Sequence, residues 1–309
     1  MRKPDERGLA LLMTLWVLVL LAVVGASFAV SMRAGLASAR NFREDTQAYY
    51  QAVAGYEDAV RFLLDDKDDS VDYTDTEERL IVANMGDPFE EERENAFGRV
   101  TVRIFDESAR ISLNSAPRDS FVTMLTRSGV DDKGADEIAD SIADWRDPDD
   151  EHRLNGAETD FYEPLGYEAK NGPFSAVEEL LMLKGMDADI LYGNAERELT
   201  GIRDYFTICP AGGMNVNTVS QEMMDILGVP YSSIQSIMLQ RASGPVLSIP
   251  DHARRVGINN TSSNCFRIVA SAEPAGTTYA RTIEAVVMRV SRGGHKDVSV
   301  LQWRDDVSR

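Results

Sequence analysis

The chain has few of the residues on which enzymes and cysteine-rich folds depend. Its 309 residues include two cysteines and three histidines. Two cysteines are too few for a zinc site built from three or four thiolates or for a disulfide-dense scaffold, although one bridge remains possible. The sequence also lacks the motifs GxSxG, GxxxxGK, HExxH and CxxC. These absences argue against an enzyme.

Positive charge is also scarce. There are 32 basic against 51 acidic residues, which gives a formal net charge of −19. A nucleic acid would be repelled by this excess of negative charge, so no nucleic-acid partner is expected. The length and a hydrophobic content of 43% are sufficient for two compact units.

The amino terminus carries the longest apolar run. Charged residues end at Arg7 and resume at Arg33, which leaves residues 9–30 uncharged. As a helix this segment would be about 33 Å long, enough to span a bilayer. A buried core helix and a secretory signal, with small residues at 22–29, are the alternatives. Because eight residues precede the span and the remainder follows it, we expect a single-pass protein with its globular part outside the cytoplasm.

The helix is predicted to continue beyond the membrane. Residues 31–64 contain no proline, and a stripe with spacings of three and four runs through Phe42, Thr46, Tyr49, Val53, Tyr56, Val60 and Leu63. One helix from residue 9 to residue 64 would have half its length in lipid and half against a soluble domain. A surface helix after a flexible neck near Gly35 is the alternative.

A charged leader ending in Gly8, followed by this long helix and a globular head, resembles the type IV pilin and pseudopilin class. The resemblance implies that a prepilin peptidase removes residues 1–8 by cleavage between Gly8 and Leu9, and that the new amine is methylated. Most members carry Glu at the fifth mature position, which here is Met13. A carboxylate in lipid is costly unless it is paired with a neighbouring subunit. We infer that this chain occupies an end of a fibre, as in the pseudopilins of the GspK family.

The globular part is predicted to be α+β. Alternating residues in 65–113 and 202–309 predict a small antiparallel sheet of the type IV pilin kind, including a β-hairpin over residues 100–113. Residues 114–200 and a patch at 215–258 have helical patterns, with candidate helices such as SAVEELLMLKG and DADILYGNAERE. A long helix against a sheet with a large helical insertion follows.

The helical insertion contains an internal repeat. LNSAPRDSFVTMLTRSGV at Asn114 parallels VNTVSQEMMDILGV at Asn217, and both modules resemble helix-hairpin-helix or SAM-like units. DNA-binding members present basic residues near the hairpin glycine. The first turn here is acid-rich and the second carries no lysine or arginine, so we expect packing units and no DNA binding.

A candidate metal loop lies in the first module. Residues 144–163 hold eight carboxylates and two arginines, and Asp147, Asp149, Glu151 and Glu158 have the spacing of calcium-loop ligands, with Asp160 as a further candidate. His152 stands where the loop needs glycine, so a standard EF-hand is not expected. Clustered oxygen ligands favour calcium in a structural role, as the resemblance to K pseudopilins also implies. A solvated acidic loop is the alternative.

The two cysteines are expected on strands. Cys209 and Cys265 each lie in a β-type run and could face each other. In an oxidising periplasm a bridge between them would stabilise the fold, while two buried thiols are the alternative.

The resemblance to the K component of type II secretion implies a structural function. Such a subunit associates with the I and J minor pseudopilins and the major pseudopilin, caps the pseudopilus tip and primes its assembly on the inner-membrane platform for export of folded proteins across the outer membrane. A membrane-tethered DNA-uptake receptor and a minor pilin of a type IV pilus are the alternatives.

Overall fold

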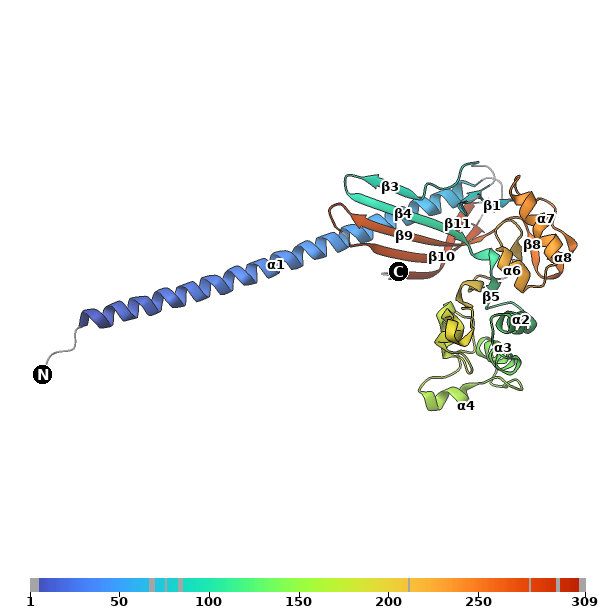
Figure 1. Cartoon of the computed structure of the whole chain (residues 1–309), viewed down its shortest axis with the longest axis horizontal. Helices are drawn as coiled ribbons and strands as arrows, with labels where there is room; N and C mark the ends of the chain where they lie inside the picture. Colours follow the sequence, from blue (N-terminus) through green and yellow to red (C-terminus); the bar gives the residue numbers. More distant parts are fainter. Residues whose placement is uncertain are drawn as a thin grey trace.

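The protein is a long helix that ends in a mixed helical and sheet head (Figure 1). The computed structural model describes residues 6–66, 70–75, 77–82, 86–210, 212–277, 279–292 and 295–305, without the side chains of residues 6–10 and 292. Both the long helix and the antiparallel sheet expected from the sequence are present.

Helix α1 (Glu6–Asp65) is continuous over 60 residues. No break occurs near Gly35, so the prediction of a single uninterrupted helix is confirmed. The large apolar side chains from Leu11 to Val30 are exposed, and α1 is long and apolar enough to cross a membrane. The head packs only on the other half of the helix (Figure 1).

One five-stranded antiparallel sheet forms the centre of the head. Its strands are β3 (Glu92–Asn95), β4 (Gly98–Asp106), β9 (Cys265–Pro274), β10 (Arg281–Arg292) and β11 (His295–Asp305), in the order β11-β10-β9-β4-β3. The pairings β3–β4 and β9–β10–β11 join neighbours in sequence, whereas β4 pairs with β9 across the whole helical insertion. The insertion therefore leaves and returns at the middle of the sheet.

Small residues of α1 form its contact with the sheet. Ala48, Ala52 and Ala59 are fully buried, and a Cβ at Gly55 would lie 2.7 Å from a methyl carbon of Val102. The predicted stripe is buried only towards its end, from Tyr56 to Leu63, while Phe42 is 74% exposed. The sequence pattern predicted the buried face from its large apolar residues. The helix can approach the sheet closely only where its residues are small, so the alanines and Gly55 form the contact.

The predicted hairpin over residues 100–113 is wrong. Strand β4 ends at Asp106, whose carboxylate accepts a 2.7 Å hydrogen bond from the backbone N–H of Ser108 and so caps a short 3-10 helix. The chain then leaves the sheet, and β5 (Ile111–Ser112) pairs parallel with β6 (Phe206–Thr207). Local alternation identified both extended segments but not their partners.

Helices gather at the end of the sheet furthest from the amino terminus (Figure 1). They are α2 (Arg118–Arg127), α3 (Asp132–Arg146), α4 (Thr159–Tyr162), α5 (Ala188–Tyr192), α6 (Gln221–Ile226), α7 (Tyr231–Arg241) and α8 (Asp251–Arg255). Short 3-10 helices span Glu107–Ala109, Glu163–Leu165, Val177–Met182, Ala195–Arg197 and Arg203–Tyr205. The remaining pairs are antiparallel β1 (Asp72–Thr74) with β2 (Leu80–Val82) and parallel β7 (Met214–Asn215) with β8 (Ile258–Asn260).

Two hydrophobic cores result. One lies between α1 and the sheet and includes Leu63, Ile104 and Phe266. The other joins the helices to one another and reaches the sheet at Cys265 and Val286. Two predicted α-helices are shorter than expected: SAVEELLMLKG forms only the 3-10 helix of residues 177–182, and DADILYGNAERE turns at Gly193 after α5.

Candidate metal centre

The helical insertion is built from two equivalent units, each closed by the side chain of an asparagine. The side chain of Asn114 accepts from the backbone N–H of Phe174 at 2.7 Å and donates to its carbonyl at 3.0 Å. The side chain of Asn217 does the same with Val246, at 2.6 and 3.2 Å. Each asparagine thus joins the start of its unit to the segment after the second helix.

An arginine at the end of the second helix repeats in the same way. Arg146 donates at 2.8 and 3.0 Å to the carbonyls one residue before and two residues after Asn114. Arg241 donates to the corresponding two carbonyls around Asn217. Burial lowers the pKa of both guanidinium groups, that of Arg241 to about 10. The expected internal repeat therefore has matching side-chain roles as well as matching sequence.

The two units differ in the connection that follows this arginine. After Arg241 the second unit has only Ala242 and Ser243 before a Gly-Pro pair. After Arg146 the first unit has residues 147–171 before its own Gly-Pro pair. The acidic loop is therefore an insertion in the first unit that the second unit lacks. The second unit forms the equivalent helix, α7, without such a loop.

Three of the predicted ligands come together in this loop. Asp147 stands at the carboxyl end of α3, Asp149 follows it, and Glu158 precedes α4. One carboxylate oxygen from each lies within 4.8 Å of the other two. A carboxylate at the carboxyl end of a helix faces the negative end of the helix dipole, which favours a cation beside it.

The innermost of these three carboxylates has no hydrogen-bond partner in the part of the chain that the structure describes. Glu158 is 2% exposed, and neither of its side-chain oxygens accepts a hydrogen bond. The Oδ1 atom of Asp147 is likewise buried and unpartnered. Buried carboxylate oxygens normally have partners because an unsatisfied charge is costly. These three oxygens therefore fit the ligand set of a hard divalent cation.

The electrostatics of the loop also favour a bound cation. Burial, and after it the negative charges of Asp144 and Asp147, raise the pKa of Glu158 to about 7. A cation at this position would offset both causes. The other two predicted ligands are not part of the group: Glu151 and Asp160 are exposed, and neither lies in the three-carboxylate cluster.

Several residues that hold the loop were not identified from the sequence. Asp140 accepts from the backbone and side-chain nitrogens of Asn155 at 3.2 and 3.0 Å. The ammonium group of Lys184 donates to the carbonyls of Asn155 and Gly156 at 3.0 and 3.2 Å. Gly156 packs against Asp144, where a Cβ would lie 1.9 Å from a carboxylate oxygen. Asp140 and Asp144 are four residues apart on α3, and this helical spacing was the available signal.

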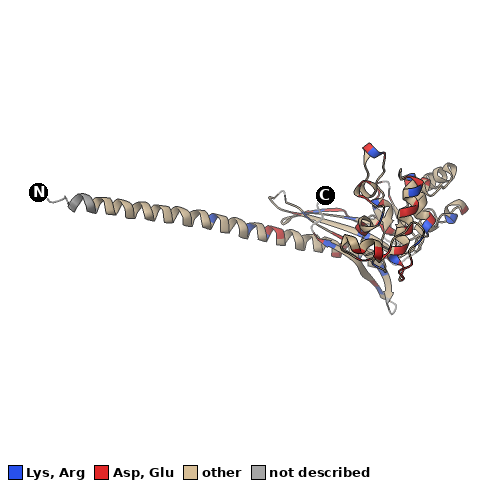
Figure 2. Cartoon of the chain, turned by 90° about the horizontal axis from the view of Figure 1, so that it is seen from below, with Lys and Arg blue, Asp and Glu red and all other residues tan. Residues whose placement is uncertain are grey.

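Negative charge is concentrated around this site. Residues 114–200 contain 21 acidic and eight basic side chains. Figure 2 shows charged residues throughout the head but none along residues 11–32 of α1. Cations are therefore attracted to the head.

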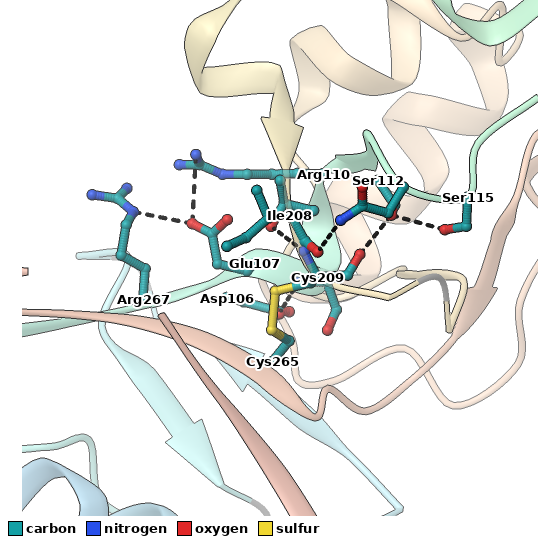
Figure 3. The surroundings of a disulfide bond; sticks show 12 residues. Asp106, Glu107, Arg110, Ser112, Ser115, Ile208, Cys209, Cys265 and Arg267 are labelled. Atoms are coloured by element: carbon teal, nitrogen blue, oxygen red, sulfur yellow. Dashed lines mark hydrogen bonds and ion pairs between the residues drawn. A yellow bond between two sulfur atoms is a disulfide. The ribbon is translucent and has the colours of Figure 1, made fainter. Parts of the chain in front are cut away.

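The two cysteines lie at the junction of the sheet and the helical units (Figure 3). Cys209 and Cys265 form a disulfide with a Cα–Cα distance of 6.3 Å. Close by, Glu107 bridges Arg110 and Arg267 at 3.5 and 3.0 Å. The disulfide connects the segment between the two units to Cys265, the first residue of β9.

The expected processing site lies at the start of α1. The backbone of Gly8 and Leu9 is helical, while their side chains lie outside the described residues. The cleavage prediction therefore stands on the sequence.

Known proteins resemble this chain in sequence. A family model described as "Type II secretion system (T2SS), protein K" matches residues 100–193. A putative type II secretion system protein K of Escherichia coli (strain K12) is 25% identical over 226 residues, covering 69% of this chain and 65% of that protein. Type II secretion system protein K of Klebsiella pneumoniae is 28% identical over 195 residues and 59% of each chain. The aligned region is thus less than two-thirds of the length of either relative.

A solved structure shares the fold. One chain of the crystal structure of the GspK-GspI-GspJ complex from the enterotoxigenic Escherichia coli type 2 secretion system matches with a TM-score of 0.63 and 17% identity. The match covers 87% of this chain and 99% of that chain. This likeness concerns the fold, and the family-model match includes the metal loop. Over residues 100–193 this chain is similar to the type II secretion system protein K family.

Proposed function

We propose that this chain is a minor pseudopilin that caps the tip of the type II secretion pseudopilus and primes its assembly for export of folded proteins. The observation that carries the proposal is the bulky helical insertion at the end of the head furthest from the amino terminus (Figure 1). A subunit with this mass above its sheet has no room for another subunit stacked on top. The role is structural and not enzymatic.

The membrane half of α1 supports a terminal position. No acidic side chain occurs between residues 11 and 43, and Met13 stands at the fifth position after the proposed cleavage site. A subunit within the fibre needs a carboxylate there to pair with the amine of its neighbour, because an unpaired charge in lipid is costly. Before assembly α1 anchors the subunit in the inner membrane with its head in the periplasm.

Processing of the leader follows from the same role. A prepilin peptidase cleaves between Gly8 and Leu9, and methylation of the new amine follows. The mature chain then begins with the uncharged segment of α1. The head is a pilin-like domain carrying two helical modules of the helix-hairpin-helix or SAM kind, which serve packing.

The proposed partners are the I and J minor pseudopilins, the major pseudopilin and the inner-membrane assembly platform. The similar solved structure is a complex of K, I and J components, and this likeness supports the same association here. The exposed apolar surface of α1 between residues 32 and 50, which includes Leu36, Phe42 and Tyr50, is available for packing against neighbouring stalks.

We further propose a structural calcium ion in the acidic loop. Asp147, Asp149 and Glu158 would hold it through the oxygens that lack hydrogen bonds. Calcium accepts irregular carboxylate sites more readily than magnesium does. The bound ion would supply the positive charge that keeps the loop compact, and it would take no part in a reaction.

DNA uptake is the weaker alternative. The first hairpin glycine, Gly129, is covered, because a Cβ there would lie 2.6 Å from the carbonyl oxygen of Glu198. At the second hairpin, the amide of Gly228 already donates to Asp225 at 2.9 Å. Neither turn offers free amides and a basic side chain to a phosphate.

Co-purification and copy number test the main proposal. The full chain, expressed with the I, J and major pseudopilins, is expected to form a stable complex with I and J and to occur once per fibre end in purified pseudopili. Its deletion should abolish secretion, while the exported proteins are still synthesised and remain in the cell. Incorporation at many copies along fibres would contradict a cap. Micromolar DNA binding at moderate salt would favour the uptake receptor.

A further inference from the structure

One cation already lies inside the acidic loop. The guanidinium Nη1 of Arg153 is 2.5 Å from Oδ1 of Asp144 and 2.7 Å from Oδ2 of Asp147. Asp144 is fully buried, whereas the arginine side chain is 43% exposed. We propose that Arg153 is a built-in counter-ion of the metal site, which keeps the loop folded without metal and weakens its affinity for calcium. This inference rests on the proposed calcium site.

The side chain of Arg153 is one of several contacts that hold the loop. Its backbone N–H donates separately to Oδ2 of Asp144 at 3.0 Å. The next two residues are held by Asp140 and Lys184 through the hydrogen bonds described above. Removal of the guanidinium therefore leaves the main-chain anchors of the loop in place, and what is lost is its charge.

Arginine and metal can share Asp147. Arg153 contacts Oδ2, while Oδ1 is buried and has no partner. The same side chain can therefore offer one oxygen to a cation and keep the other on the guanidinium. Arg153 holds Asp147 in this orientation, and it does not contact Glu158, whose two oxygens remain unpartnered.

A fixed positive charge beside a cation site has two opposite effects. In the absence of metal it offsets the mutual repulsion of the carboxylates and stabilises the loop. In the presence of metal it repels the ion, and removal of a unit charge a few ångströms away is expected to raise affinity about tenfold in a partly hydrated site. Arg153 thus tunes the site towards weaker, reversible binding.

The test compares three variants of the full-length chain purified in detergent. Arg153→Gln removes the charge, and Arg153→Lys keeps it. Arg197→Gln is the matched control, because Arg197 also bridges two carboxylates, Asp187 and Asp189, at 2.8 Å each and is 48% exposed. Calcium affinity is measured by isothermal titration with calcium chloride, and thermal unfolding is followed with calcium and with chelator.

Arg153→Gln is expected to bind calcium about tenfold more tightly than the wild type and to unfold at a lower temperature in chelator, so that calcium raises its midpoint further. The calcium affinity of Arg153→Lys should differ from that of the wild type by less than about threefold. That of Arg197→Gln should differ by less than about twofold. An unchanged or weaker affinity in Arg153→Gln would overturn the inference while leaving the calcium site intact. A wild type that binds no calcium would remove both.

Discussion

Buried carboxylates behave differently here according to what lies beside them. Asp72 is fully buried but has Arg289 at 2.7 Å, and only its Oδ1 lacks a partner. Glu158 is buried, and among the described residues neither of its carboxylate oxygens has a hydrogen-bond partner. The first is an internal ion pair of the fold, and the second has the character of a ligand whose partner comes from outside.

Replacement of Glu158 by glutamine tests the ligand role. Glu158→Gln is expected to weaken calcium binding at least a hundredfold, because the innermost charged ligand is lost. In chelator the variant should be more stable than the wild type by about 1–2 kcal/mol, since an unpaired buried charge is removed. Isothermal titration and urea unfolding of the full chain measure the two effects.

Glu151→Gln is the control for this substitution. Its side chain is exposed and outside the cluster, so calcium affinity should change by less than about twofold. Equal losses in both variants would indicate general attraction by the acidic surface and would rule out a site formed by Glu158.

The pH dependence of stability tests the buried pair. Burial raises the pKa of Asp72 to about 6, against 3.8 for the free side chain. Between about pH 4 and pH 6 the native state therefore holds a proton that the unfolded chain releases, so this group lowers the free energy of unfolding as pH rises through that window. Above the window the penalty is complete and constant.

Asp72→Asn removes this titration. Relative to wild type, the free energy of unfolding of the variant should increase by about 2 kcal/mol between pH 4 and pH 7. Arg289 keeps its second partner, Asp66, at 2.6 Å, so the variant should still fold. Urea unfolding across this range measures the difference, and parallel curves for the two proteins would show that Asp72 is ionised throughout.

At the scale of elements, the two halves of the continuous helix α1 have different surfaces. Its first half has exposed, large apolar side chains and is apolar enough to cross a membrane, while its second half presents small residues to the sheet. Gly55 lies in the second half, where methyl carbons of Val102 and Val100 would be 2.7 and 2.9 Å from an added Cβ. The absence of a side chain at Gly55 therefore allows the sheet to approach α1 closely.

Two glycine substitutions in α1 separate helix propensity from packing. Gly55→Ala should destabilise the head by about 1–3 kcal/mol, because the extra methyl group overpacks the contact with β4. Gly35→Ala has nothing within 4 Å of the new Cβ and should be neutral or stabilising by up to about 1 kcal/mol. Urea unfolding followed by circular dichroism measures both, and equal effects would contradict a packing role for Gly55.

At the scale of the whole molecule, the disulfide links the second helical unit covalently to the sheet. The helical insertion leaves the sheet after β4 and returns at β9, and Cys209 and Cys265 are 56 residues apart on either side of the second unit. Closing this loop restricts the unfolded chain and fastens the second unit to the sheet.

Removal of the bridge should therefore weaken the head as a unit. The double variant Cys209→Ser with Cys265→Ser is expected to lose about 2–4 kcal/mol of unfolding free energy. Denaturant unfolding measures this loss, and the wild type with a reductant should show the same shift. An unchanged midpoint in both samples would mean that the bridge adds nothing to the packing already present.

Local patterns were sufficient for much of this architecture. The uncharged run, the lack of proline and the apolar spacing predicted α1 correctly, because helix continuity depends on neighbours along the chain. The alternating runs of β9, β10 and β11 were also recognised, as were the carboxylates of the loop and the equivalence of Asn114 and Asn217. These features depend on residues close together along the chain or on direct similarity between two segments.

Contacts between distant segments were beyond the reach of such patterns. The pairing of β4 with β9 joins strands separated by the whole helical insertion, so alternation around residue 104 suggested the nearer but wrong partner at residue 111. The composition of the loop, likewise, did not distinguish Glu158 from Glu151. Burial distinguishes them, because desolvation depends on what packs around a carboxylate, and that is decided only when α3, α4 and Lys184 come together in the folded head.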